Sequence, residues 1–233
     1  MGISATAIKS ESAVPRSMLV AFSGADCTGK STQIGLLRNF IHEHRGKTRY
    51  LWLRVGYTRN ICWVKDQVRR LIGRDRLPHG ASSQRDRFMS SGWKRRIWLY
   101  CSFADLLFET AIRVRCLRMS GCVVICDRYL DDSEIDLRLN FGEWAARMWT
   151  WRLVRWAAAR PEVHIYLDLP FEEQLRRSID KREPFPDSEE VRRLRARFYD
   201  AMKTGAKWTV LDTQSAVNDT STAIRSLVQT GMR

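Results

Sequence analysis

The chain has 233 residues, and its 40 Lys and Arg against 26 Asp and Glu give a formal net charge of +14. The length fits one large domain whose core needs no disulfide or metal, and a hydrophobic fraction of 44% argues against a disordered chain. No apolar run reaches the roughly 18 residues that a transmembrane helix needs, and the basic balance favours a polyanionic partner.

Strand patterns and helical patterns alternate along the chain. After a polar segment at 1–17, which we interpret as a flexible leader, the run MLVAFS at 18–23 is typical of a buried parallel strand. The alternation predicts an α/β fold with a five-stranded parallel sheet flanked by helices. In chain order we expect strands at 18–23, 48–55, 122–126, 163–169 and 208–211, and helices at 31–43, 61–72, 93–119, 143–159, 171–181, 188–203 and 219–229.

One segment stands outside this alternation. Residues 73–92 combine Gly, Pro, Ser, Asp and Arg without a period, which predicts a loop. From Lys65 to Arg96 the chain carries ten basic residues and three acidic ones. We therefore expect a single domain over 18–233, with a basic insertion around 73–96 and a lid around 171–187.

The segment 24–31 reads G-x-x-x-x-G-K-S and lies between an expected strand and an expected helix. This context predicts a phosphate-binding loop, because glycines let backbone N–H groups turn toward phosphate oxygens and the helix N-terminus adds positive potential. We expect Lys30 to reach the β- and γ-phosphates of ATP and the Ser31 hydroxyl to bind Mg²⁺. The expected cofactor-binding residues are Gly24, Ala25, Cys27, Thr28, Gly29, Lys30, Ser31 and Thr32.

Charged residues follow the third and fourth expected strands. Ligands bind at the carboxyl ends of the strands of a parallel sheet. Asp127 is therefore a candidate ligand of Mg²⁺, together with Ser31, and Arg128 is a candidate ligand of a phosphate. An arginine in a closing lid can stabilise the γ-phosphate during transfer. The basic residues that cluster after the fourth strand are Arg176, Arg177, Lys181 and Arg182.

Four stretches together resemble the thymidylate kinase family. Residues 22–33 (FSGADCTGKSTQ) are similar to its F-x-G-x-D-x-x-G-K-S-T-Q, and residues 121–133 (GCVVICDRYLDDS) look like its G-x-V-V-x-x-D-R-Y-x-x-S-S. Residues 160–170 (RPEVHIYLDLP) look like its P-D-x-x-x-Y-L-D-x-P, and residues 208–213 (WTVLDT) match its last strand and the turn beside the adenine. The resemblance covers about residues 18–230 and implies the P-loop kinase fold.

The resemblance implies an ATP-dependent kinase that moves the γ-phosphate to a nucleoside monophosphate, with dTMP as the default acceptor. It places Asp26 on the acceptor sugar hydroxyl and Arg128 on the acceptor phosphate. Cys27 fills the place where one subgroup has its catalytic arginine, so the resemblance assigns that role to the lid. The catalytic residues that it implies are Lys30, Asp127, Arg128, Arg176 and Arg182, and the substrate-binding residues are Asp26, Arg54, Asp105, Arg128 and Ser133.

The acceptor side departs from the family's pattern, whereas the donor side keeps it. Arg54 matches the arginine of the family's T-R-E-P-G, but no acid follows it. Asp105 matches an aspartate that the family pairs with an arginine, and Leu106 stands in place of that arginine. Asp136 and Leu137 stand where the family has the Tyr-Gln that faces the base.

Two other classes of function stay open on the residues alone. A catalytically inactive protein that binds a nucleotide or a membrane is one, and the intact phosphate loop argues against it. A kinase for the hydroxyl of a sugar, nucleoside or glycan is the other, and it needs a carboxylate to accept the hydroxyl proton. The carboxylates that could serve are Asp127, Asp131, Asp132 and Asp136.

Partners and location follow from three further features. No aromatic-rich motif accompanies the basic segment, so we expect no nucleic-acid partner. The six cysteines form no CxxC pair, and a reducing cytoplasm is the expected location. The predicted helix at 143–159 mixes arginines with tryptophans, which favours core packing or a homodimer interface over contact with a membrane. Its tryptophans are Trp144, Trp149, Trp151 and Trp156.

Overall fold

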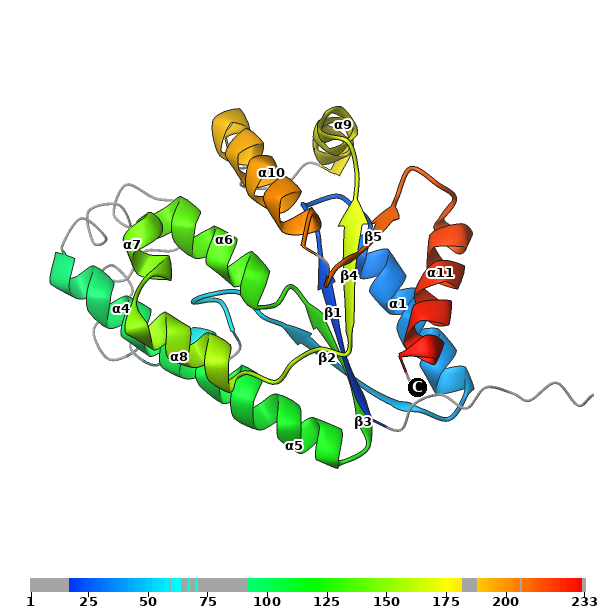
Figure 1. Cartoon of the computed structure of the whole chain (residues 1–233), viewed down its shortest axis with the longest axis horizontal. Coiled ribbons are helices and arrows are strands. Elements are labelled where there is room, and N and C mark those ends of the chain that lie inside the picture. The colour runs from blue at the N-terminus through cyan, green and yellow to red at the C-terminus, as the bar shows by residue number, and fades with distance from the viewer. Residues whose placement is uncertain are drawn as a thin grey trace, which may run out of the picture.

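Figure 1 shows the computed structural model of the chain. The structure describes residues 17–58, 60–63, 67, 70, 92–181, 188–205 and 207–231. The predictions for the leader before residue 17, for the basic insertion before residue 92 and for Arg182 lie outside the described residues. Most of the helix predicted at 61–72 lies outside them too.

Five strands form one parallel sheet, which confirms the predicted fold class. The strands are β1 Met18–Ser23, β2 Lys47–Trp52, β3 Cys122–Asp127, β4 Val163–Asp168 and β5 Thr209–Asp212. Their order is β2-β3-β1-β4-β5, and each neighbouring pair runs parallel. All side chains of β1 and β3 are buried, because these apolar strands lie inside the sheet with helices on both faces.

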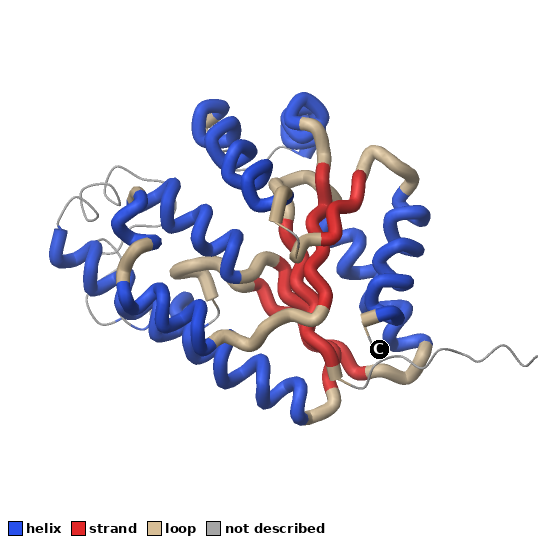
Figure 2. Tube along the Cα trace, in the orientation of Figure 1, coloured by secondary structure: helices blue, strands red, loops and turns tan. Residues whose placement is uncertain are grey.

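Helices cover both faces of the sheet (Figure 1), and Figure 2 shows the strands as a central layer between them. α1 (Lys30–Glu43) and α11 (Val217–Thr230) pack on one face in a cluster with β1, β3 and β4. The helices on the other face and above the sheet are α4 Gly92–Leu107, η2 Phe108–Arg113, α5 Val114–Met119, α6 Leu130–Phe141, α7 Glu143–Ala146, α8 Trp149–Ala157, α9 Phe171–Lys181 and α10 Glu189–Lys203.

α4, η2 and α5 form one continuous helix over 92–119, as the sequence predicts at 93–119. Its middle part, η2, is a π-helix, in which the wider turn disturbs the usual hydrogen-bond ladder. The carbonyl of Thr110 accepts a hydrogen bond at 3.0 Å from the N–H of Ala159, which follows α8. The widened turn therefore ties the long helix to the segment that leads into β4.

The prediction of a single helix at 143–159 is wrong, because the helix is interrupted at Met148 (φ −59°, ψ 140°). α7 ends before this residue and α8 begins after it. The break lets Trp144 and Met148 join Trp151 in the same apolar cluster with α4. Burial of these side chains in one cluster therefore outweighs the continuation of the helix.

α6 is a helix that the sequence reasoning missed. Its first turn carries Asp131 and Asp132, and the Asp132 carboxylate accepts a hydrogen bond at 3.1 Å from the N–H of Tyr129. Acidic residues in a first turn stabilise a helix through its dipole and by binding free N–H groups. That signal was readable, but it was interpreted only as a cluster of candidate bases.

Two smaller points complete the fold. Cys122 and Cys126 on β3 are buried free thiols, as their apolar neighbours indicate. Over the described part of the chain, the helices lack the combination of length and apolarity that crossing a membrane requires.

Candidate active site

The phosphate loop joins β1 to α1, as the sequence predicts. Gly24 has φ +140°, and a Cβ there would lie 2.6 Å from the Leu167 carbonyl of β4. Gly29 also has a left-handed φ of +86° immediately before α1. These two conformations require glycine, and they turn the loop so that its N–H groups and the start of α1 face one cavity.

Lys30 lies folded over this loop. Its Nζ donates hydrogen bonds to the carbonyls of Gly24 at 2.8 Å and Ala25 at 2.5 Å. Burial, together with the charge of Arg128, lowers the pKa of Lys30 to about 8. The ammonium is therefore held against the loop carbonyls at the edge of the cavity described below, and it loses its proton more easily than a surface lysine.

A cavity of about 420 Å³ opens over the loop at the carboxyl ends of β1 and β3. Residues predicted to bind ATP and residues predicted to bind the phosphate acceptor both line this cavity. Its wall is formed by Asp26, Cys27, Gly29, Lys30, Ser31, Thr32, Trp52, Arg54, Asp127, Arg128 and Arg177.

Asp127 is the last residue of β3 and lines this cavity. Its Oδ2 accepts a hydrogen bond from the Tyr50 hydroxyl at 3.0 Å, whereas its buried Oδ1 finds no hydrogen-bond partner among the described residues. Asp127 and Ser31 both line the cavity, and a carboxylate oxygen and a hydroxyl oxygen are donor types that suit Mg²⁺. The described residues contain no group of three or more His, Cys, Asp or Glu placed to hold a metal, so phosphate oxygens would complete such a site.

Arg128 is buried at the wall of the same cavity and has a left-handed φ of 67°. Its guanidinium donates to Asp26 at 2.5 Å and to the Tyr199 hydroxyl at 3.1 Å. Burial would raise the pKa of Asp26, but the charges of Arg128 and Lys30 lower it to about 2. Asp26 is therefore ionised and holds Arg128 in position at the phosphate loop.

Asp132 anchors this arrangement from below. Its Oδ1 accepts hydrogen bonds from Ser23 at 2.8 Å and from the Tyr199 hydroxyl at 2.8 Å. Burial raises the pKa of Asp132, and its side chain is 1% exposed. Because Asp132 is sealed from the cavity by its partners, it supports Tyr199 and Arg128 and is badly placed to act as a base.

A second group of charges lies on the acceptor side. Asp136 of α6 accepts hydrogen bonds from Arg54 at 2.8 Å and from Arg195 of α10 at 2.5 Å. Burial would raise the pKa of Asp136, but the charges of Arg54, Arg195 and Arg128 hold it below its usual value. A smaller cavity of about 110 Å³ lies here between the phosphate loop, α9 and α10, with Asp26, Arg54, Gln174, Ser178 and Arg195 among its lining residues.

Sequence reasoning did not find Arg195. The residue lies on α10, which carries several arginines, and its burial distinguishes it from the others. That burial depends on how α10 packs on α6, which no local pattern reveals.

The lid arginines take different positions on α9. Arg177 lines the larger cavity and also donates to Glu173 at 2.8 Å. Arg176 donates to Glu173 at 2.8 Å through a mostly exposed side chain and is not among the residues that line either cavity. Of the arginines predicted for the lid, Arg177 is therefore the one beside the phosphate loop in the described structure.

The remaining predicted residues lie outside the two cavities. Asp105 on α4 accepts a hydrogen bond from the Thr58 hydroxyl in the loop after β2. Ser133 is buried in α6, and within the described ranges its hydroxyl has no hydrogen-bond partner. Asp131 forms an ion pair with Lys207 at 2.7 Å, away from the phosphate loop.

Comparisons with known proteins agree with this geometry. The family model described as thymidylate kinase matches residues 114–224, a segment that includes Asp127 and Arg128 but begins after the phosphate loop. A crystal structure of thymidylate kinase from Ehrlichia chaffeensis has the same fold, with a TM-score of 0.55 and 21% sequence identity over 92% of this chain and 100% of that chain. No curated protein matches the sequence. The chain resembles the thymidylate kinase family, and the matches indicate a kinase of the nucleoside monophosphate class, a transferase.

Proposed function

We propose that this protein transfers the γ-phosphate of ATP to a nucleoside monophosphate, with dTMP as the default acceptor. The observation that carries the proposal is that Lys30 and the buried Arg128 line the same cavity. Transfer between two phosphate groups needs both held in line within one space.

The donor half is formed by the loop and the start of α1. The N–H groups of the loop and the positive end of α1 bind the phosphates of ATP, and Lys30 exchanges its carbonyl partners for the β- and γ-oxygens. Ser31 and Asp127 would hold Mg²⁺, whose charge neutralises the phosphates when it is bound. The unpartnered oxygen of Asp127 supports this assignment.

The acceptor half binds the phosphate that receives the γ-phosphoryl group. Arg128 presents a guanidinium fixed by Asp26 and Tyr199, so its geometry is set before the acceptor arrives. Arg54 adds a second cation at the cavity wall, and Asp26 is placed to accept a hydrogen bond from a sugar hydroxyl. The attacking atom is already a phosphate oxygen, so the reaction needs no general base.

Arg177 is our candidate for the lid arginine that stabilises transfer. It reaches the cavity from α9, and its hydrogen bond to Glu173 can be exchanged for one to the transferring phosphate. Arg176 serves in this account as a surface partner of Glu173 and not as a catalytic residue. The neighbouring Arg182 stays a prediction from the sequence.

A hydroxyl acceptor is the second candidate, and one observation keeps it open. Of the four carboxylates considered as bases, Asp131, Asp132 and Asp136 are each engaged by other side chains. Asp127 lines the phosphate cavity and keeps an unpartnered oxygen, so it is the carboxylate that could accept a hydroxyl proton. Such a role would compete with the binding of Mg²⁺ by the same oxygen.

The test is a measurement of ADP release from ATP and Mg²⁺ with a panel of acceptors. We expect strong stimulation by at least one nucleoside monophosphate and none by the corresponding nucleosides or by free sugars. Stimulation by sugars or nucleosides alone would favour the hydroxyl acceptor. If no nucleoside monophosphate stimulates ADP release, the proposal is wrong.

A further inference from the structure

The smaller of the two cavities lies between the phosphate loop, α9 and α10, and both helices lie beyond the carboxyl end of β4 (Figure 1). It is hereafter the side cavity. Its volume of about 110 Å³ exceeds the roughly 30 Å³ that one water molecule takes up in the liquid, so it has room for a group of several heavy atoms. Its charged and polar lining residues are Asp26, Arg54, Gln174, Ser178, Arg192 and Arg195.

The side cavity presents more positive than negative charge. Three arginines line it, and among its described lining residues Asp26 is the only acid. Asp26 already binds Arg128 at 2.5 Å. Asp136 approaches from α6 and is shared by Arg54 and Arg195, at 2.8 Å and 2.5 Å. Within the described structure the cations at this wall therefore outnumber the carboxylates, which favours an anionic occupant.

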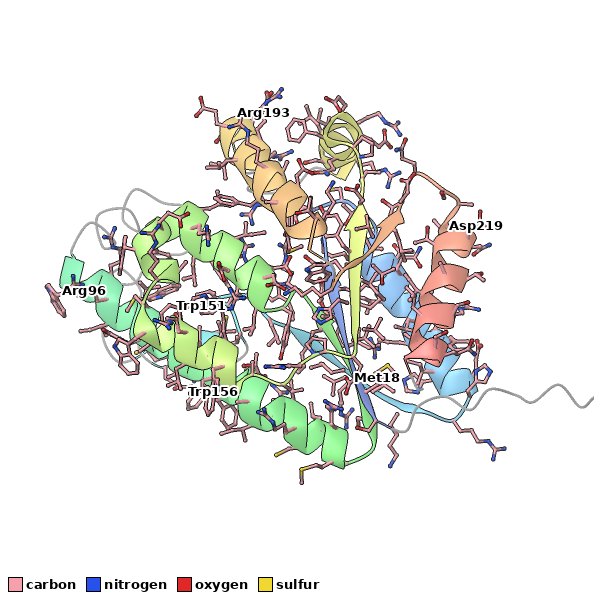
Figure 3. All side chains as sticks on the ribbon, viewed as in Figure 1. Met18, Arg96, Trp151, Trp156, Arg193 and Asp219 are labelled. Carbon is pink, nitrogen blue, oxygen red and sulfur yellow. The ribbon has the colours of Figure 1, made fainter. Side chains whose placement is uncertain are left out.

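The arginines of α10 divide between the side cavity and the outer surface. Arg195 lines the cavity with only 8% of its side chain exposed. Arg192 also lines it, is half-buried, and donates a hydrogen bond at 3.0 Å to the Ser178 hydroxyl of α9. Arg193, by contrast, is exposed at the end of α10 that points away from the sheet (Figure 3). Turning guanidiniums inward costs solvation unless an anion replaces the water, and their planar fork matches a phosphate.

The side cavity and the larger phosphate cavity share a wall, because Asp26 and Arg54 line both. The acceptor phosphate of the proposed reaction binds Arg128 in the phosphate cavity. The atoms that follow this phosphate in the acceptor would therefore lie beside Asp26 and Arg54, next to the side cavity. With one sugar hydroxyl on Asp26, a group on a neighbouring position of the sugar would enter the side cavity.

We propose that the side cavity binds a second anionic group of the acceptor, and that the acceptor is a nucleoside monophosphate with a further phosphate on its sugar. The inference rests on the proposed transfer to a nucleoside monophosphate and names the class of acceptor more closely. An uncharged group is a poorer occupant, because it would displace water from Arg192 and Arg195 without replacing the lost hydrogen bonds. A phosphate offers oxygens in several directions, which suits guanidiniums that come from α10 and from the loop after β2.

The experiment is calorimetry of the full chain with its donor half filled by ADP and Mg²⁺, so that a second nucleotide binds on the acceptor side. The Kd of thymidine 3′,5′-bisphosphate is compared with that of thymidine 5′-monophosphate. Uridine 2′,5′- and 3′,5′-bisphosphate are compared with uridine 5′-monophosphate, because their ribose keeps one free hydroxyl for Asp26. We expect at least one bisphosphate to bind about tenfold or more tightly than the monophosphate of its own nucleoside.

A charge-matched pair of variants on α10 separates the side cavity from the net charge. Arg192→Ala removes a lining guanidinium, and the preference for the bisphosphate should fall to about twofold or less. Arg197→Ala removes the same charge from an exposed position that lines neither cavity, and the preference should stay. Arg192→Lys keeps the charge without the fork, so it should keep part of the preference. A cooperative thermal transition like that of the unmodified protein shows that each variant is folded.

Three outcomes would overturn the inference. They are binding of every bisphosphate no tighter than that of its monophosphate, a preference that Arg192→Ala retains in full, and an equal loss of preference in Arg192→Ala and Arg197→Ala. Because the calorimetry needs no turnover, these outcomes differ from a failure of the proposed function. That failure would appear in the separate assay, as ADP release that no nucleoside monophosphate stimulates.

Discussion

The donor half and the acceptor half of the site are built in different ways. Apart from Asp127, the proposed donor half comes from one continuous segment, 24–31, whose shape is fixed by two glycines with left-handed φ and by the start of α1. The proposed acceptor half joins Arg128 at the end of β3 to Arg54 in the loop after β2. Arg54 is held by Asp136 of α6, which also binds Arg195 of α10. One half is local in the sequence, and the other exists only after the chain has folded.

This difference predicts how each half of the site tolerates amino-acid substitutions. A loop made by backbone N–H groups accepts many side chains so long as Gly24, Gly29 and Lys30 remain. The acceptor half depends on charges that neutralise one another in a buried place, so removal of one charge leaves the others uncompensated. Changes in the donor half should therefore affect turnover, and changes in the acceptor half should affect both substrate preference and stability.

The largest effect is expected for Lys30→Ala. The variant loses the cation that follows the β- and γ-phosphates, and we expect the kcat for ATP turnover to fall about 1000-fold with every acceptor. Steady-state kinetics measure it, with Lys207→Ala as a control because that lysine pairs with Asp131 at the surface. A kcat within tenfold of the unmodified protein would contradict the assignment of the loop.

A smaller effect on turnover is expected for Arg177→Ala. Because this guanidinium lines the phosphate cavity, its loss should lower kcat about 100-fold with little change in the KM for ATP. Arg176→Ala removes a neighbouring arginine that pairs with Glu173 at the surface, and it should leave kcat within about twofold. The reverse order of the two variants would show that Arg176 is the lid arginine.

Asp136→Asn should act on stability. The variant leaves Arg195 buried without its carboxylate, and because Arg54 is partly exposed we expect a loss of about 2–3 kcal/mol in the free energy of unfolding. Urea denaturation measures the loss. Asp131→Asn, which breaks only the surface pair with Lys207, should cost about 0.5 kcal/mol or less. Equal costs for the two variants would mean that the buried charges do not hold the acceptor half together.

The smallest effect concerns the pH dependence of ATP binding. The pKa of Lys30 is about 8 in the free protein, and the phosphates of ATP favour its charged form. Below pH 8 the ammonium is present and affinity should be constant. As the pH rises above 8, binding must first protonate Lys30, so the Kd for ATP should rise about tenfold per pH unit. Calorimetry from pH 7 to about 10 tests this, and Lys30→Ala should show a flat profile.

The sequence alone predicted most of the fold and most of the donor half. A strand, a glycine loop and a helix in succession define the phosphate site, because that site is made by local backbone geometry. The acceptor half could be predicted only in part. Asp136 was recognised as a replaced position, but its partners were not, because Arg195 is brought to it by the packing of α10 on α6.

Two helical errors have similar causes. The helix at 130–141 was missed because its apolar spacing is weak and its first-turn acids were interpreted as chemistry and not as a helix start. The break at Met148 follows from packing of Trp144 and Trp151 into one cluster, which no periodicity encodes.

The central claim is that Lys30 and Arg128 hold two phosphates for direct transfer in one cavity. The most direct test is phosphorus NMR of the protein with Mg²⁺, ATP and the nucleoside monophosphate that best stimulates ADP release. We predict that a new diphosphate signal of the acceptor appears as ATP is consumed, and that Lys30→Ala abolishes it. Release of inorganic phosphate alone, or a phosphate monoester formed on a hydroxyl, would contradict the account.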